Sequence, residues 1–319
     1  MRDAFARKID YMRVSITDRC NLRCAYCMPE DVESIGHAQV LRFEELLRLC
    51  GIMAGLGIKT IRVTGGEPLV RKGCLDFIRQ LKNTKGIENV TLTTNGILLG
   101  QYLDELASLG LNGLNISLDA LDAAIYHKIT GFDVFDEVWA SVERAAAMGL
   151  KVKINCVPMK NVNESQILPM VALAEKMPVD IRFIELMPTG ANDGLAGLST
   201  EDVLGIVKKH YQNLTADDSW HGFGPARYFK DSGMLGSVGF ISAISDIFCA
   251  GCNRIRLSSD GFLTLCLHQN EGMDLRGMLR GGATDREIAA EVALNIDKKP
   301  EKHELGEKVN LQHMSKIGG

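Results

Sequence analysis

A repeated alternation of short apolar strands and amphipathic helices constrains the fold of this chain more than any other feature. The strand patterns recur at intervals of about thirty residues, which is the length of one β-α-β unit. Six strands are predicted, over residues 13–17, 58–63, 90–94, 114–118, 152–157 and 181–186. Helical spacing of apolar residues marks the segments between them, chiefly 43–56, 98–109, 138–148 and 167–177. Such alternation is typical of a parallel sheet with right-handed crossovers.

The number of units is smaller than a closed barrel requires. Eight units close a parallel α/β barrel, and only six are visible here. We therefore predict an α/β fold whose core is an incomplete parallel (β/α)6 barrel. After residue 189, glycines interrupt the pattern. A helix is predicted at 200–211, and short strands are predicted at 227–230, 239–242, 255–257 and 263–266. We predict that this smaller C-terminal α+β region covers the open side, with one domain at 1–219 and a second at 220–319.

Composition limits the kind of protein. The chain has 319 residues, a formal net charge of −4 and no apolar run long enough to span a membrane. Its first ten residues lack the apolar core of a signal peptide. We therefore expect a cytoplasmic protein whose nine cysteines are ligands or core residues rather than disulfides. The acidic balance argues against a nucleic-acid partner, and no membrane partner is expected.

A first group of three cysteines follows the first predicted strand within eight residues, at Cys20, Cys24 and Cys27. Thiolates are soft ligands that select zinc, copper(I) or iron–sulfur clusters. A closed zinc site or a fully ligated cluster takes four protein ligands, so three leave one coordination position open to a substrate. The alternative is a redox-active or merely packed group of cysteines.

A second group of three cysteines near the end of the chain has two interpretations. Its members are Cys249, Cys252 and Cys266. His268 would complete a closed zinc site of three cysteines and one histidine. Arg254 and Arg256, however, would share one face of a strand beside this group, and arginine binds phosphate oxygens in a bidentate fork. This arrangement favours an anionic substrate, and the alternative is an exposed, solvated arginine pair.

Polar residues gather at the carboxyl ends of the six predicted strands, where parallel barrels place their chemistry. Beyond the first cysteine group, these strand ends carry Gly65, Gly66, Glu67, Thr93, Thr94, Asn95, Ser117, Asp119, Asn155, Glu185 and Met187. Any one of them is equally well explained as a turn former or a helix cap. Their common edge with the first cysteine group predicts a single site.

The first cysteine group, with Tyr26 before its last member, resembles the signature of the radical S-adenosylmethionine enzymes. Gly65-Gly66-Glu67-Pro68 resembles the glycine-rich loop of the same superfamily. The resemblance implies that the three cysteines hold a [4Fe–4S] cluster whose open iron binds the amino and carboxylate groups of S-adenosylmethionine. Glycine lets the backbone approach a ligand closely, and Glu67 has the charge to receive an ammonium group.

A narrower resemblance rests on three further features. They are Asp18-Arg19-Cys20-Asn21, the second cysteine group with its two arginines, and the terminal Ile317-Gly318-Gly319. Together they are similar to the GTP 3′,8-cyclase family of molybdenum cofactor biosynthesis, from Phe5 to the last residue.

This resemblance implies a lyase that removes the hydrogen at C3′ of GTP with a 5′-deoxyadenosyl radical. The C3′ radical then joins C8 of the guanine, and reduction gives 3′,8-cyclo-7,8-dihydro-GTP. A second [4Fe–4S] cluster, with three cysteine ligands, would contact the guanine through its free iron. The resemblance also implies a flavodoxin- or ferredoxin-type reductant, a cyclic pyranopterin monophosphate synthase as the downstream partner, and a monomer or homodimer.

The site residues of the family carry over position by position. The ligands of the two clusters would be Cys20, Cys24, Cys27, Cys249, Cys252 and Cys266. Contacts to S-adenosylmethionine would come from Tyr26, Gly65, Gly66, Glu67, Ser117 and Met187. Contacts to GTP would come from Arg13, Arg62, Thr93, Lys153, Arg254 and Arg256. The residues that would assist the radical chemistry are Arg13, Gly318 and Gly319.

The residues themselves support part of this assignment. Arg13, Arg62 and Lys153 fall on predicted strands, where a buried cation needs an anion or a polar partner. The alternative for Lys153 is a solvated strand edge. Glycine suits a tail that enters a narrow channel, because it has no side chain to clash.

Two other functions are compatible with the cysteines. One is a peptide-modifying radical S-adenosylmethionine maturase with an auxiliary cluster, which would usually carry more C-terminal cysteines than the three found here. The other is a non-catalytic iron–sulfur electron carrier or a zinc-stabilised binding protein. An electron carrier uses fully ligated clusters, so two groups of three cysteines argue against it.

Overall fold

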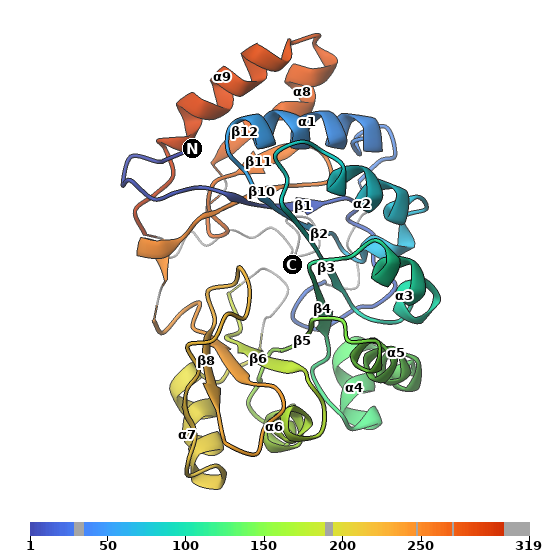
Figure 1. Cartoon of the computed structure of the whole chain (residues 1–319), viewed down its shortest axis with the longest axis vertical. Coiled ribbons are helices and arrows are strands. Elements are labelled where there is room, and N and C mark those ends of the chain that lie inside the picture. Colours follow the sequence, from blue (N-terminus) through green and yellow to red (C-terminus); the bar gives the residue numbers. More distant parts are fainter. Residues whose placement is uncertain (29–34, 189–193, 247, 270, 303–319) are drawn as a thin grey trace. The chain divides into compact units, whose positions relative to one another are not determined.

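The computed structural model describes residues 1–28, 35–188, 194–246, 248–269 and 271–302 (Figure 1). The chain divides into two compact units, each with strands and helices. The first unit comprises Met1–Asn21, Glu30–Thr93 and Cys249–Gly319, and the second comprises Leu22–Pro29 and Thr94–Phe248. The predicted domain boundary between residues 219 and 220 stays a prediction.

The first unit is built on strands in the order β12-β11-β10-β1-β2-β3. These are β1 (Tyr11–Ser15), β2 (Thr60–Thr64), β3 (Asn89–Thr94), β10 (Arg254–Leu257), β11 (Phe262–Thr264) and β12 (Gly272–Asp274). Neighbours from β10 to β3 run parallel, whereas β11 and β12 pair antiparallel. In β1, Met12 and Val14 are fully buried, and Arg13 between them is half-buried. Successive side chains of a strand point to opposite faces, so Arg13 faces away from this apolar core.

The helices of the first unit cover this sheet. They are α1 (Phe43–Gly55), α2 (Cys74–Lys82), α8 (Leu275–Arg280) and α9 (Asp285–Ile296), with short 3-10 turns η1 (Pro68–Val70) and η3 (Cys249–Gly251). Figure 1 shows α1, α8 and α9 stacked on the same side of β10 and β1. In α1, Leu46, Leu49 and Met53 are fully buried, as the spacing of apolar residues on one helical face requires.

The second unit is built on strands in the order β4-β5-β6-β9-β8-β7. Its strands are β4 (Gly113–Ser117), β5 (Val152–Cys156), β6 (Asp180–Ile184), β7 (Thr215–Ala216), β8 (Arg227–Lys230) and β9 (Val238–Ile241). The strands β4, β5, β6 and β9 run parallel, and β7 and β8 pair antiparallel at the end.

The helices of the second unit follow the alternation that the sequence predicts, with one addition. They are α3 (Leu99–Ser108), α4 (Ala123–Thr130), α5 (Phe135–Ala147), α6 (Ile167–Lys176) and α7 (Thr200–His210), with the turn η2 (Glu164–Gln166). The apolar pattern does not indicate α4. Its limits come from local chemistry: Asp122 caps the amide of Ile125, and Gly131 ends the helix with a φ of 78°.

The parallel α/β class predicted from the alternation is confirmed. The strands of the C-terminal region do not form a sheet of their own, because β10 pairs with β1 and β9 pairs with β6. Both pairings are parallel, and parallel pairing requires a long connection between the two strands. The sequence of each strand therefore does not indicate which strand it pairs with. Among the described residues, no helix combines the length and the apolar character needed to cross a bilayer.

Candidate functional site

The glycine-rich loop packs against the backbone that leads to Cys20. The amide of Gly66 donates to the carbonyl of Thr17 at 2.7 Å, and the amide of Glu67 donates to the carbonyl of Arg19 at 2.8 Å. A Cβ atom on Gly66 would lie 2.4 Å from the Arg19 carbonyl oxygen, and one on Gly65 would lie 2.5 Å from that of Thr17. Both glycines are therefore required for the close approach of this loop to the segment that carries the first cysteine.

Glu67 is a fully buried carboxylate within this loop. It accepts a hydrogen bond from the amide of Leu69 at 3.0 Å and so caps the turn η1. Burial raises the pKa of the nearby Cys74 thiol, and the charge of Glu67 raises it further. Cys74 is thus held as a neutral core residue.

The other two cysteines of the first group lie on a short turn of the second unit. The amide of Cys27 donates to the carbonyl of Cys24 at 2.9 Å. The turn is fixed to the end of α4, because the amides of Arg23 and Ala25 donate to the carbonyls of Thr130 and Ile129 at 3.0 and 2.9 Å. A helix that the sequence pattern does not indicate therefore holds the turn that carries Cys24 and Cys27.

Tyr26, between these two cysteines, is anchored on the end of β4. Its hydroxyl donates to the Oδ2 atom of Asp119 at 2.8 Å. The other oxygen of Asp119 accepts the amide of Val157 at 2.7 Å. Burial raises the pKa of Asp119 to about 6, and these two hydrogen bonds oppose the rise. Burial and Asp119 raise the pKa of Tyr26, and the charges of Cys24 and Cys27 raise it further.

Three polar residues of the second unit lie side by side across β4, β5 and β6. Ser117 is opposite Asn155, and Asn155 is opposite Arg182. The Oδ1 atom of Asn155 is buried and has no hydrogen-bond partner among the described residues. Arg182 is 2% exposed and donates to Asn115. Arg182 is absent from the predicted site, although a cation within the apolar run of β6 was available as a signal.

Lys153 projects from the interior strand β5 rather than from a solvated edge, which excludes the alternative raised for it. Its side chain is 14% exposed and its Nζ atom lies 3.4 Å from the Oδ2 atom of Asp180. The same Nζ donates to the hydroxyl of Tyr228 at 3.1 Å. His221 stacks on the Tyr228 ring, with centroids 3.8 Å apart and planes 12° apart, and its Nδ1 lies 3.0 Å from Asp180.

In the first unit, three arginines form a row across the strands β10, β1 and β2. Arg256 is opposite Arg13, and Arg13 is opposite Arg62. None of the three is exposed. Burial lowers the pKa of Arg256 to about 10, with a further lowering by Arg254. Burial, Arg256 and Arg62 lower the pKa of Arg13 well below its usual range. An anion bound at this row would counteract the lowering of the pKa of Arg13 and of Arg256.

Arg254 lies beside the same row. It is opposite Tyr11 on β1, and the guanidinium groups of Arg62 and Arg254 lie 5.6 and 5.7 Å from the centre of the Tyr11 ring. Arg254 and Arg256 are half-buried, so they are not the exposed pair of the alternative interpretation. At the end of β3, the Oγ1 atom of Thr93 is buried without a hydrogen-bond partner among the described residues.

The second cysteine group is also assembled in the first unit. Its thiols are partly exposed, and none forms a disulfide. Burial raises the pKa of Cys266, and the charges of Cys252 and Cys249 raise it further. Burial opposes ionisation of Cys252 as well, yet Lys299, the Arg254 amide and nearby guanidiniums hold its pKa below the usual value. A thiol favoured as thiolate fits a metal or cluster ligand.

Within the part of the chain that the structure describes, no three metal-binding side chains converge closely enough to hold one ion. A [4Fe–4S] cluster places each cysteine on a different iron, so its ligands need not converge on a single point. Met187 is described just beyond β6 and is half-buried. The predicted tail residues Gly318 and Gly319 lie outside the described residues.

The strand ends also include residues that serve the fold. Both carboxylate oxygens of Glu185 are occupied, by the amides of Thr200, Ile244 and Ser245 at 2.8 to 2.9 Å. The Asn95 side chain accepts the amide of Ile97 at 3.2 Å. For these two positions the alternative of a cap or a turn former holds.

Two family models match the chain. The radical SAM superfamily matches residues 14–174, and the molybdenum cofactor synthesis C family matches residues 179–305. Curated relatives named GTP 3′,8-cyclase match over the full length. The relative from Clostridium perfringens strain SM101 is 43% identical over 323 residues, with 100% of both chains covered. The relative from Heliobacterium modesticaldum is 45% identical over 329 residues, again with 100% of both chains covered.

Solved structures resemble the chain in fold. Streptococcus suis SuiB bound to S-adenosylmethionine has a TM-score of 0.65 and 16% identity, covering 92% of this chain and 72% of SuiB. SuiB bound to the precursor peptide SuiA has a TM-score of 0.67 and 15% identity, covering 96% of this chain and 76% of SuiB. At this identity the likeness concerns the fold alone. The family matches and the full-length relatives go further: the chain belongs to the radical SAM superfamily and, within it, to the GTP 3′,8-cyclase family.

Proposed function

We propose that this protein is a GTP 3′,8-cyclase, a carbon–carbon lyase that performs the first step of molybdenum cofactor biosynthesis. The observation that carries the proposal is the arginine row Arg256–Arg13–Arg62, because three half-buried guanidiniums in register suit a polyanionic substrate. GTP is such a substrate. The row also reconciles an acidic chain of net charge −4 with a highly charged anion.

The first cysteine group fits a [4Fe–4S] cluster with S-adenosylmethionine. When bound, the two would supply the radical that removes the hydrogen at C3′ of GTP. The chain supplies Cys20, Cys24 and Cys27 as ligands. Asp119 orients the ring of Tyr26 beside two of these thiols, which supports Tyr26 as a contact. Gly65, Gly66, Glu67, Ser117 and Met187 complete the proposed S-adenosylmethionine contacts.

The side chains proposed to contact GTP are of two kinds, cationic groups and a hydroxyl. Arg13, Arg62, Arg254 and Arg256 would bind phosphate oxygens, and Lys153 would add a fifth cation. The buried Oγ1 of Thr93 has no partner among the described residues, and a bound substrate would supply one. We propose the same role for Asn155, whose buried Oδ1 is in the same state.

The second cysteine group is proposed to hold a second [4Fe–4S] cluster through Cys249, Cys252 and Cys266, with its open iron toward the guanine. The lowered pKa of Cys252 supports a thiolate ligand there. Gly318 and Gly319 are proposed to reach the site and, with Arg13, to assist the radical chemistry. We further propose a domain at 1–219 and one at 220–319, a cytoplasmic location, a flavodoxin- or ferredoxin-type reductant and a cyclic pyranopterin monophosphate synthase downstream.

The test is an anaerobic assay of the reconstituted protein. Incubation with S-adenosylmethionine, dithionite and GTP should give 5′-deoxyadenosine and a cyclised nucleotide, both identified by mass spectrometry. Omission of GTP is the control, and it should suppress 5′-deoxyadenosine formation. A peptide-modifying enzyme would form 5′-deoxyadenosine without regard to GTP, and that result would refute the proposal.

A further inference from the structure

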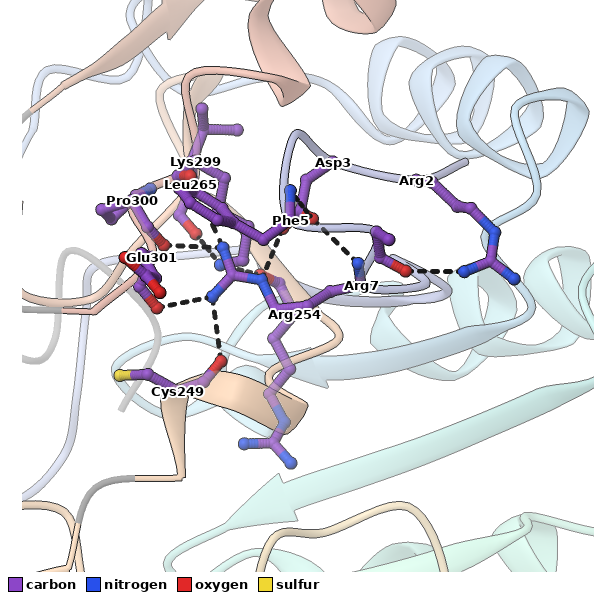
Figure 2. Close-up of polar contacts among 11 residues, drawn as sticks. Arg2, Asp3, Phe5, Arg7, Cys249, Arg254, Leu265, Lys299, Pro300 and Glu301 are labelled. Carbon is purple, nitrogen blue, oxygen red and sulfur yellow. Dashed lines mark hydrogen bonds and ion pairs between the residues drawn. The ribbon is translucent and has the colours of Figure 1, made fainter.

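A buried arginine near the N-terminus contacts the second cysteine group and the last described residues (Figure 2). The Nη1 atom of Arg7 donates to the carbonyls of Cys249 and Glu301, both at 2.9 Å. Its Nη2 donates to the carbonyl of Pro300 at 2.6 Å, and its Nε pairs with Asp3 at 2.6 Å. Arg7 is 8% exposed and Asp3 is 5% exposed. One guanidinium thus joins the first cysteine of the group to residues that directly precede the C-terminal segment.

A buried lysine makes the corresponding contacts to the other two cysteines. Lys299 is 3% exposed, and its Nζ donates to the carbonyl of Arg254 at 2.9 Å and to that of Leu265. Arg254 follows Cys252 by two residues, and Leu265 directly precedes Cys266. Figure 2 includes Lys299 together with Arg254 and Leu265. Arg7 and Lys299 therefore fix backbone beside all three cysteines.

Asp3, Arg7 and Lys299 together carry a net positive charge. Among the described residues, Asp3 is the one carboxylate that pairs with Arg7, whereas both Arg7 and Lys299 are buried cations. A buried charge is expensive unless it is compensated. The thiolates of the cysteine group supply negative charge, and a [4Fe–4S] cluster with three thiolate ligands is an anion that becomes more negative on reduction.

We propose that Asp3, Arg7 and Lys299 form a brace that positions the second cysteine group for its cluster and raises the reduction potential of that cluster. This inference rests on the proposed second cluster. Arg7 and Lys299 are positioning residues, because they act on the cysteines through backbone carbonyls and through charge. The brace also fixes residues 299–301, from which the C-terminal segment continues, relative to the same cysteine group.

The decisive variant is Lys299→Met, which keeps the length of the side chain and removes its charge and donors. Lys298→Met is the matched control, because Lys298 is exposed and donates to Asn295 at 2.7 Å. Both changes are made in the full chain with Cys20, Cys24 and Cys27 replaced by serine, so that only the second cluster gives a signal. The reconstituted proteins are compared by potentiometric titration followed by electron paramagnetic resonance, and by the rate of iron release to a chelator.

Lys299→Met should lower the reduction potential and weaken iron retention by roughly 10- to 100-fold, the range found for outer partners of metal ligands. Lys298→Met should match the parent protein in both measurements. Arg7→Lys is a second variant that keeps the charge, but an ammonium has three donors and cannot reach all of the carbonyls that Arg7 contacts. It should release iron faster with a smaller change in potential, and it decides the matter if Lys299→Met does not fold.

The results of these measurements distinguish a failure of the proposed brace from a failure of the proposed second cluster. A parent protein that loads no cluster on the second group would overturn the proposed cluster and the brace together. A parent that loads the cluster, with Lys299→Met or Arg7→Lys equal to it in potential and in iron release, would overturn the brace alone.

Discussion

Arg13 lies directly opposite Arg256 in the register that joins β1 to β10. Like charges in this position repel, and burial lowers the pKa of both groups. A protein keeps such a pair where the repulsion is relieved by a ligand. This arginine row is therefore where we propose that the polyanionic substrate binds.

We predict that Arg256→Ala raises the KM for GTP by about 10- to 100-fold, since a hydrogen bond to a charged group contributes about 1.5–3 kcal/mol. The KM for S-adenosylmethionine should change little. The free protein should be as stable as the parent or more stable, because the change removes repulsion with Arg13. Steady-state kinetics and urea unfolding test the two parts.

The control for this change is Arg227→Ala. Arg227 is exposed and pairs with Asp246 at 3.0 Å on the surface of the second unit. An equal rise in KM for both variants would show that Arg256 acts only through the overall charge of the protein.

Much of the fold follows from sequence periodicity, because the strands β1 to β6 and most of the helices between them satisfy local patterns. The pairings of β10 with β1 and of β9 with β6 do not, since the partners lie far apart in the chain. The same limit applies to Lys299, whose role depends on carbonyls 34 and 45 residues away. Lys299 lies three residues beyond the end of α9, and no sequence signal separates it from its exposed neighbour Lys298.

The candidate site divides in the same way. Cysteine spacing and the glycine-rich loop are local and were sufficient to indicate a cluster. The position of Asp119 at the end of a strand follows from the sequence pattern. Its hydrogen bond to Tyr26 does not, because the two residues are 93 positions apart. Glu185 is the opposite case, a polar residue at a strand end that serves the fold. Neighbouring backbone amides donate hydrogen bonds to both of its carboxylate oxygens.

The pKa of Asp119 predicts a pH dependence of stability. Its folded value of about 6 lies above its ordinary value of 3.8, so the folded protein keeps a proton that the unfolded chain has lost between these values. The free energy of unfolding should therefore fall as the pH rises through this window and level off above it, with a slope of at most about 1.4 kcal/mol per pH unit. Asp119→Asn should remove this part of the slope. Urea unfolding of both cluster-free proteins from pH 4.5 to 7 measures the difference, and parallel curves would contradict the assignment.

We predict that His221→Phe weakens GTP binding without disabling the chemistry. Phenylalanine keeps the stacking on Tyr228 but loses the contact to Asp180, which also holds Lys153. The expected rise in the KM for GTP is about fivefold, which corresponds to one net hydrogen bond of about 1 kcal/mol, and kcat should change less.

His210→Phe is the control for this substitution, because His210 is exposed at the end of α7 and meets the Tyr211 ring edge to face, with centroids 4.9 Å apart. A loss of kcat in His221→Phe with an unchanged KM would indicate that the network serves a step other than binding.

Gly66→Ala should prevent loading of the first cluster. The added Cβ would lie 2.4 Å from the Arg19 carbonyl oxygen and 2.7 Å from that of Asp18, and neither backbone atom can move without displacing Cys20. We expect a loss of stability of about 1–3 kcal/mol from the overpacking, together with the loss of the iron bound by the first group.

Gly51→Ala is the matched control, because a Cβ there meets nothing within 4 Å and the position lies in α1, where alanine should stabilise by about 0.5–1 kcal/mol. Iron content and urea unfolding of the two variants, measured side by side, decide the question. Full iron loading in Gly66→Ala would mean that the glycine-rich loop does not set the position of the first cysteine.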